Sequence, residues 1–399
     1  MSATVHVNKS ELMAPPVAQT IQQRSLIIGA VFTVIVVAGI FMWPAVVYPA
    51  YLIAFMSWLG VTLGSLALIM LQHMTGGAWG LVGRRVWEAA TRTLPLNFVA
   101  FIPVAFGIPY LYDWAKPAIL AKDPHLREFT HSYLNATGFV YRGILYFAIW
   151  AFLIYLLNRW SVEQDSHDFD TLRFRKLSAP GLILYAFSIS FAVVDWVMSL
   201  QARWISTIYG MIFMVGQALS ALCFLLVIEA IFSKRKPMSE YLHETEVHDH
   251  SKLTLTFIML WAYFSFSQFL IIWAGNLPEE ITWYFRRLHN GWEYVGLFLA
   301  AFHFAVPFAI LLGRHFKRHT RTMVWIAVWL MVMRLVDVWW HVDPVFYQSI
   351  SISGLAWAVI CAIAIGGLWL AYFFRNLRSL PMLPLLAPGT DKLLESEHE

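Results

Sequence analysis

Long apolar runs separated by short polar segments dominate the pattern of this chain. A helix that spans a membrane needs about 20 mostly apolar residues, and ten runs approach or exceed that length. They cover residues 25–42, 47–71, 95–112, 138–158, 181–200, 206–233, 253–274, 292–313, 322–341 and 351–374. The sequence therefore predicts an all-α polytopic membrane protein with about ten transmembrane helices. The predicted membrane domain covers residues 25–374, between an N-terminal segment (1–24) and a C-terminal tail (375–399).

Two sequence features recur four helices apart. The fifth run ends in Val194-Asp195-Trp196 and the ninth in Val336-Asp337-Val338-Trp339. The fourth run ends in Leu-Leu-Asn158-Arg159 and the eighth in Leu-Leu-Gly313-Arg314. A spacing of four helices preserves direction, so the pattern predicts a parallel repeat of two four-helix bundles, helices 2–5 and 6–9. Helices 1 and 10 would be peripheral.

The composition supports a membrane environment. Hydrophobic residues make up 59% of the chain and charged residues only 13%, about half the fraction typical of soluble proteins. The net charge of +4 comes without a long basic tract, which argues against nucleic-acid binding. Cys223 and Cys361 both fall in apolar runs, far from any CxxC spacing, so the chain has no disulfide framework, cysteine-ligated iron–sulfur cluster or covalent haem site of its own.

The distribution of Lys and Arg predicts the orientation. With ten spans, twenty of the 28 basic residues flank the side that carries both termini, seven flank the other side, and Arg334 lies inside a run. The positive-inside rule then places both termini in the cytoplasm. The polar start of the chain also lacks the form of a cleaved signal peptide.

Ionisable residues inside apolar runs are the first functional candidates. Asp195 lies in such a run, with Ser188 and Ser199 on the same helical face. A charge at the membrane centre costs at least ~2.5 kcal/mol on insertion scales, so it is expected to face a bundle interior, a partner charge or a water path.

The ninth run carries a second group of ionisable residues. Arg334, Asp337 and His341 are spaced three and four apart, so Arg334 can pair with Asp337 within the helix. Asp195, Gln268 and this group would lie in the outer half of the membrane, where they could converge. Two interpretations stay open: a polar pocket or proton path open to the outside, and an ion-pair network that fixes helix packing.

Histidines add three further candidates. His303 stands four residues before Pro307, which frees its carbonyl and predicts a kink, so His303 could relay protons or bond across a helix interface. His73 and Trp79 flank a glycine-rich turn that could contact a quinone head group or a lipid phosphate, or serve as a membrane-surface anchor. The stretch 243–250 could chelate a metal or be a solvated linker.

The C-terminal tail after Leu380 is rich in proline and acidic residues. It could be a surface strap or a disordered end.

Several longer motifs resemble the ActF-type subunit of alternative complex III, within the NrfD-like family. These are Asp195-Trp-Val-Met-Ser-Leu200 with the run 204–210, the runs 259–268 and 273–280, the run 73–80, and the eighth helix through His303, Pro307, Arg314 and Arg318. The resemblance covers about residues 25–375. One departure concerns positions 201–203, where the family often has Glu-Pro-His and this chain has Gln-Ala-Arg.

The resemblance implies paired four-helix bundles without a redox cofactor in this chain. It implies a subunit of a bacterial quinol:electron-acceptor oxidoreductase in the inner membrane, which oxidises quinol or menaquinol and passes electrons to cytochrome c or a small copper protein. Iron–sulfur clusters and haem c would belong to periplasmic partners, and the quinol site to a longer NrfD-like sibling. The same resemblance favours Asp195, His303, Arg334 and Asp337 as proton-path candidates.

Two other functions stay open at this point. The chain could bind and oxidise quinol directly through His73 or the outer polar group. A secondary transporter with a parallel repeat is the other alternative, although Pro307 has no counterpart in the fourth run.

Overall fold

The computed structural model describes residues 11–166, 170–313 and 320–395, and every regular element in them is helical. Lys9, Arg314, Lys317 and Arg318, which entered the charge count or the resemblance, lie outside the described residues. The long helices are α1 (Val17–Met42), α2 (Pro44–Thr75), α3 (Ala78–Thr91), α4 (Leu94–Phe106), α8 (Ala136–Gln164), α9 (Leu172–Trp196), α10 (Tyr209–Phe232), α12 (Glu244–Gly275), α17 (Thr320–Val342) and α18 (Ile352–Leu377). One further span consists of α14 (Trp292–Leu299), the π-helix η3 (Ala300–Ala305) and α15 (Val306–Leu312).

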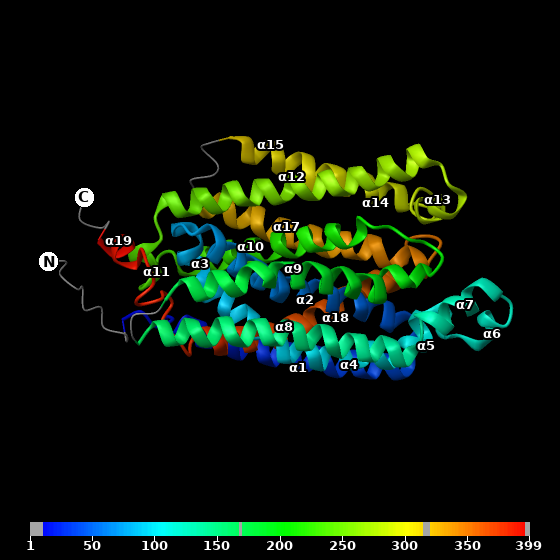
Figure 1. Ribbon diagram of the computed structural model, residues 1–399, viewed down its shortest axis with the longest axis horizontal. Helices are drawn as coiled ribbons and strands as arrows, with labels where there is room; N and C mark the ends of the chain where they lie inside the picture. The colour runs from blue at the N-terminus through cyan, green and yellow to red at the C-terminus, as the bar shows by residue number, and fades with distance from the viewer. Residues whose placement is uncertain (1–10, 167–169, 314–319, 396–399) are drawn as a thin grey trace.

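Short helices connect the spans. At the end of the molecule away from the described chain ends, here called the far end, lie α5 (Ile108–Leu111), α6 (Pro117–Leu120), α7 (Pro124–Ser132) and α13 (Pro278–Phe285) (Figure 1). The opposite end, called the terminal end, holds α11 (Met238–Tyr241) and α19 (Thr390–Glu395). The 3₁₀ turns are η1 (Asp113–Ala115), η2 (Met198–Gln201) and η4 (Asp343–Val345).

Nine spans of the described chain are long and apolar enough to cross a membrane, and α3 with α4 makes a tenth that bends by 42°. Both α1 and α19 begin at the terminal end, which fits an even number of crossings (Figure 1). The prediction of about ten transmembrane helices is therefore confirmed. The largest difference is in the third span, which runs from Ala78 to Phe106 instead of over 95–112. Helices α1, α9 and α12 also begin eight or nine residues earlier than predicted.

The bend between α3 and α4 has a local cause and a local compensation. Pro95 stands in the first turn of α4, where it has no backbone N–H to continue the preceding helix. The Thr91 hydroxyl donates to the Glu88 carbonyl at 2.8 Å, and the Thr93 hydroxyl donates to the Ala90 carbonyl at 2.7 Å. These bonds satisfy polar groups that an interrupted helix would otherwise leave unpaired in the membrane.

The long helices form two four-helix groups. Helices α2, α4, α8 and α9 contact one another in a ring, and α10, α12, the α14–α15 span and α17 form a second ring. The contact between α2 and α10 joins the two rings, while α2 also contacts α17 and α10 contacts α9. Helices α1 and α18 pack against each other at the side of α2. This arrangement agrees with the predicted bundles of helices 2–5 and 6–9 and the peripheral first and tenth helices.

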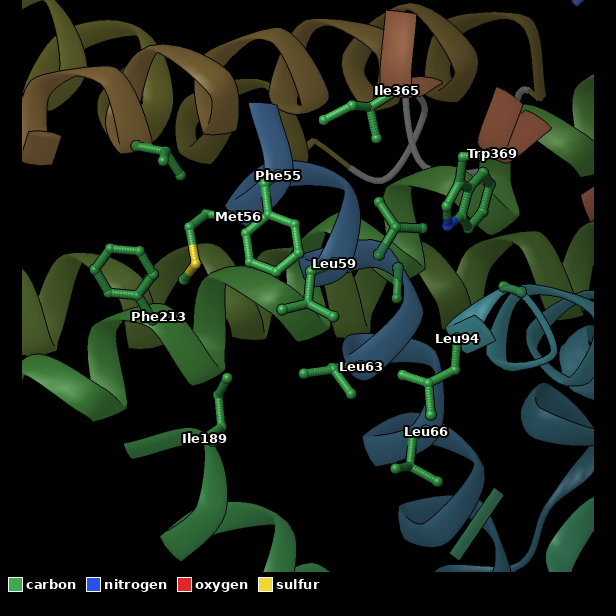
Figure 2. Packing of buried hydrophobic residues seen from close by; sticks show 14 of the residues in the cluster. Phe55, Met56, Leu59, Leu63, Leu66, Leu94, Ile189, Phe213, Ile365 and Trp369 are labelled. Atoms are coloured by element: carbon green, nitrogen blue, oxygen red, sulfur yellow. The ribbon is translucent and has the colours of Figure 1, made fainter. Parts of the chain in front are cut away.

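Close approach of α2 and α10 depends on glycine. Helix α2 is apolar on all sides, as expected of a helix surrounded by others, and Figure 2 shows its Phe55, Met56 and Leu59 among side chains of neighbouring helices. Gly60 and Gly64 form a GxxxG pair, the spacing that lets membrane helices pack at short range. A Cβ atom at Gly64 would lie only 1.9 Å from the backbone oxygen of Gln217 on α10.

The C-terminal tail is a surface strap in the part that the structure describes. The Met382 amide donates to the Leu12 carbonyl at 2.7 Å, and the Leu385 amide donates to the Asp165 carboxylate at 3.0 Å. Met382 and Leu383 are fully buried. Of the two interpretations of the tail, the strap is therefore confirmed over these residues.

Candidate functional site

Asp195 is a fully buried carboxylate at the end of α9. Arg142 of α8 donates one hydrogen bond of 2.9 Å to each carboxylate oxygen of Asp195. The Tyr146 hydroxyl donates to the same carboxylate at 2.7 Å. The Arg142 guanidinium also stacks on the Tyr133 ring at 3.8 Å and donates to the Tyr133 carbonyl at 3.1 Å. Asp195 is thus held by a bidentate ion pair and a hydroxyl, an arrangement that fixes α8 against α9.

The predicted serine stripe beside Asp195 is buried. Ser188 accepts a hydrogen bond of 2.9 Å from the Trp150 indole, and Ser199 donates to the backbone carbonyl of Asp195. Arg142 was not predicted as the partner of Asp195. Its position four residues before Tyr146 on α8 was the available signal, since that spacing places both side chains on one helical face.

Arg334 and Asp337 form a buried ion pair within α17, which confirms the pairing predicted from their spacing. His341, one turn further on, has its Nε2 atom 3.8 Å from the second Asp337 oxygen. The guanidinium of Arg334 fits against α10 because residue 216 is glycine: a Cβ there would lie 2.1 Å from the guanidinium carbon. Both charges are therefore enclosed inside the second bundle.

His303 lies on the π-helix η3, fully buried, with its ring 4.0 Å from that of Trp261 on α12. The sequence predicted a kink at Pro307, and the structure has a π-helical turn directly before it, in which the Val306 amide donates to the Ala301 carbonyl. Neither ring nitrogen of His303 has a hydrogen-bond partner in the described part of the chain. Arg334 Nε and His341 Nδ1 also have no hydrogen-bond partner among the described residues.

The two groups of charges do not form one pocket. Within the described residues, no hydrogen bond or ion pair links Asp195 to Arg334 or Asp337, because each group is enclosed by its own bundle. Gln268 is also separate, since it accepts a hydrogen bond of 3.2 Å from the Ser206 hydroxyl near the far end of α12. The convergence considered from the sequence is therefore replaced by two distinct clusters.

The two clusters also differ in how completely they are paired. Asp195 accepts two hydrogen bonds from a guanidinium and one from a hydroxyl. In the second cluster, several buried nitrogen atoms have no acceptor among the described residues. A buried polar group without a partner costs about 1–3 kcal/mol. Buried groups of this kind usually bond to water or take part in function. The Arg334, Asp337, His341 and His303 cluster is therefore the stronger candidate for chemistry.

At the terminal end, His73 and Trp79 face different surroundings. The His73 ring stacks on Phe174 at 4.4 Å and lines a cavity of about 230 Å³. The backbone carbonyl of Trp79 lies 2.6 Å from Nε2 of His250. The indole ring of Trp79 packs on that of Trp87. Only His73 of the predicted pair therefore lines the cavity.

Two buried ion-pair groups at this end escaped the sequence analysis. His250 lies 2.8 Å from Glu229 of α10, with both side chains fully buried. The stretch 243–250 forms the first turns of α12, and within the described chain no cluster of three potential ligands could hold a metal. The second group joins Arg84, Arg85, Glu88 and Asp165 through contacts of 2.5 to 3.0 Å. Lone acids inside apolar runs and charges four apart were the available signals.

Neither a scan against protein-family models nor a search of curated proteins finds a match for this chain.

Replacing Gly216 with alanine is expected to destabilise the protein by about 1–3 kcal/mol, the usual range for overpacking. The added methyl group would displace the Arg334 guanidinium from Asp337. Thermal unfolding of the purified protein in detergent measures the effect. Gly275→Ala is the matched control because a Cβ there meets no described atom within 4 Å. Equal stability of the two variants would contradict the tight fit of Arg334.

Proposed function

We propose that this chain is an integral membrane subunit of a bacterial quinol:electron-acceptor oxidoreductase, which scaffolds the complex and conducts protons through its second bundle. The proton role is supported by the buried cluster of Arg334, Asp337, His341 and His303. Several of its nitrogen atoms have no hydrogen-bond partner among the residues that the structure describes. Carboxylate and imidazole groups in series are the usual components of proton relays in membranes.

The depth of the cluster supports this role. Asp337 stands five residues before the end of α17, which corresponds to about 8 Å along the helix axis. The cluster thus lies in the half of the membrane nearer the far end. With both termini in the cytoplasm, that half faces the periplasm, where protons from quinol oxidation would leave.

The packing of the motifs supports the place in a complex. Two of the motifs that carry the resemblance, 195–210 and 273–280, meet at the far end. The Trp204 indole donates to the Glu280 carbonyl at 3.0 Å, and its ring stacks on that of Trp283. Helices α5 to α7 extend from the same end (Figure 1). This end is the expected docking face for the iron–sulfur and multihaem cytochrome c partners, and the longer NrfD-like sibling would hold the quinol site beside it.

A proton-translocation assay on the purified complex in liposomes tests the proposal. We expect Asp337→Asn to reduce quinol-driven proton release to the background of empty liposomes, because an amide cannot exchange protons in the relay. Asp195→Asn is the matched control, since its carboxylate is already saturated by Arg142 and Tyr146.

Two results would contradict parts of the proposal. If Asp337→Asn assembles and releases protons at the normal ratio to electrons, the chain is a scaffold only. If a photo-crosslinking quinone labels this chain instead of its sibling, direct quinol binding replaces the accessory role. A chain that purifies without haem and iron–sulfur partners and moves a solute would instead be a transporter.

A further inference from the structure

The cavity beside His73 lies at the terminal end of the first bundle, where four segments meet. They are the end of α2, the start of α3, the end of α8 and the start of α9, with Pro388 of the tail at its edge. Its volume of about 230 Å³ is several times the ~30 Å³ that one water molecule occupies in the liquid. Because these segments are helix ends, the cavity lies at the depth of lipid head groups.

Two buried polar atoms in the cavity wall have no hydrogen-bond partner in the part of the chain that the structure describes. Nε2 of His73 and Nη2 of Arg84 make no hydrogen bond to the described residues. Water does not readily replace such a partner, because His73 is only 9% and Arg84 only 4% exposed. Arg84 uses its Nε atom for Glu88 at 3.0 Å, and its guanidinium stacks on Phe174 at 4.8 Å. Phe174 thus holds both His73 and Arg84 in place. An unpaired guanidinium nitrogen at this burial calls for an acceptor.

The electrostatics of the cavity favour an anion. Arg84 and the exposed Arg175 both line it, and none of the described residues that line it is acidic. In the described part of the chain, the neighbouring ion-pair network contains three guanidinium groups, Arg84, Arg85 and Arg92, and two carboxylates, Glu88 and Asp165. The cavity therefore has an excess of positive charge beside it.

The start of α3 adds a second, independent source of positive potential. The 14-residue helix begins after Gly77, which lines the cavity together with Gly76. Both glycines have positive φ, 71° at Gly76 and 100° at Gly77, so the chain turns into the helix without side chains that would fill the space. Free N–H groups and the helix dipole at such a start stabilise an anion.

We propose that this cavity binds a phosphate group, held by His73, Arg84, Arg175 and the start of α3. A quinone head group is neutral and would gain little from two guanidinium groups and a helix dipole, whereas a phosphate gains charge-assisted bonds from each. At head-group depth the source is an anionic phospholipid such as phosphatidylglycerol, and a free phosphate ester offers the same chemistry. The binding is independent of the redox role proposed above.

Native mass spectrometry of the full chain tests lipid binding. The purified protein is mixed in detergent with equal amounts of phosphatidylglycerol and phosphatidylcholine, and the lipid retained by each molecule is counted. We expect preferential retention of one phosphatidylglycerol. Arg175→Gln should lower that retention about five-fold, the effect of one basic residue near a lipid surface. His73→Phe should lower it similarly while it keeps the ring stack on Phe174.

Lys176→Gln is the matched control, because it removes the same charge from an exposed neighbouring position that does not line the cavity. A parallel thermal-shift measurement with inorganic phosphate separates the two sources. If phosphate stabilises the wild type but not His73→Phe, and no lipid preference exists, the ligand is a free phosphate ester. The proposal is overturned if neither probe distinguishes the wild type from His73→Phe and Arg175→Gln, or if Lys176→Gln loses as much as Arg175→Gln.

Discussion

Replacing Gly64 with alanine is expected to destabilise the protein by about 3 kcal/mol, the upper end for overpacked cores. The new Cβ would lie 1.9 Å from the backbone oxygen of Gln217 and 2.4 Å from its carbonyl carbon. A side chain could rotate away from such a clash, but the backbone of α10 cannot. The variant must therefore separate α2 from α10, the contact that joins the two bundles. Unfolding of the purified chain by heat or denaturing detergent measures the loss.

Gly60→Ala is the control from the same helix face. A Cβ there would lie 3.4 Å from the Cγ atom of Gln217, which is an ordinary contact with a flexible side chain. Both substitutions gain about 1 kcal/mol of helix propensity, so Gly60→Ala should be neutral or stabilising. Similar losses in the two variants would show that the helices do not approach as closely at Gly64 as described.

The sequence predicted the number and grouping of the helices because lipid requires each span to be long and apolar. The position of the third span was predicted wrongly because part of this span is not apolar. Helix α3 carries Arg84, Arg85 and Glu88, which lower its hydropathy to that of a loop. These charges are paired with one another and with Asp165, which directly follows α8 and lies 80 residues from Arg85. A helix that neutralises its charges through a distant partner cannot be recognised from its own composition.

The same distinction explains which site residues could be predicted. Arg334 and Asp337 are three residues apart, so helical geometry alone brings them together. Arg142 and Asp195 are 53 residues apart, and His250 and Glu229 lie on different helices. Their pairing depends on how α8 packs on α9 and α12 on α10, which hydropathy does not specify. The hypothesis of a single outer pocket failed for that reason.

Replacing Arg142 with methionine is expected to destabilise the protein by about 3–5 kcal/mol, the usual loss when one partner of a buried ion pair is removed. Asp195 is fully buried and would lose both hydrogen bonds from the guanidinium while it keeps the one from the Tyr146 hydroxyl. The reverse variant, Asp195→Asn, should lose less, about 1–2 kcal/mol. The Arg142 side chain is 22% exposed and can turn its charge toward water. Thermal unfolding of both variants in the same detergent measures the difference.

The double variant Arg142→Met/Asp195→Asn separates packing from function at this pair. If the pair only fixes α8 against α9, the double variant should be more stable than Arg142→Met alone, because no unpaired charge remains buried. It should also leave proton release by the assembled complex unchanged. A double variant that regains stability but not proton release would instead place Asp195 on the proton path and contradict its assignment as a packing residue.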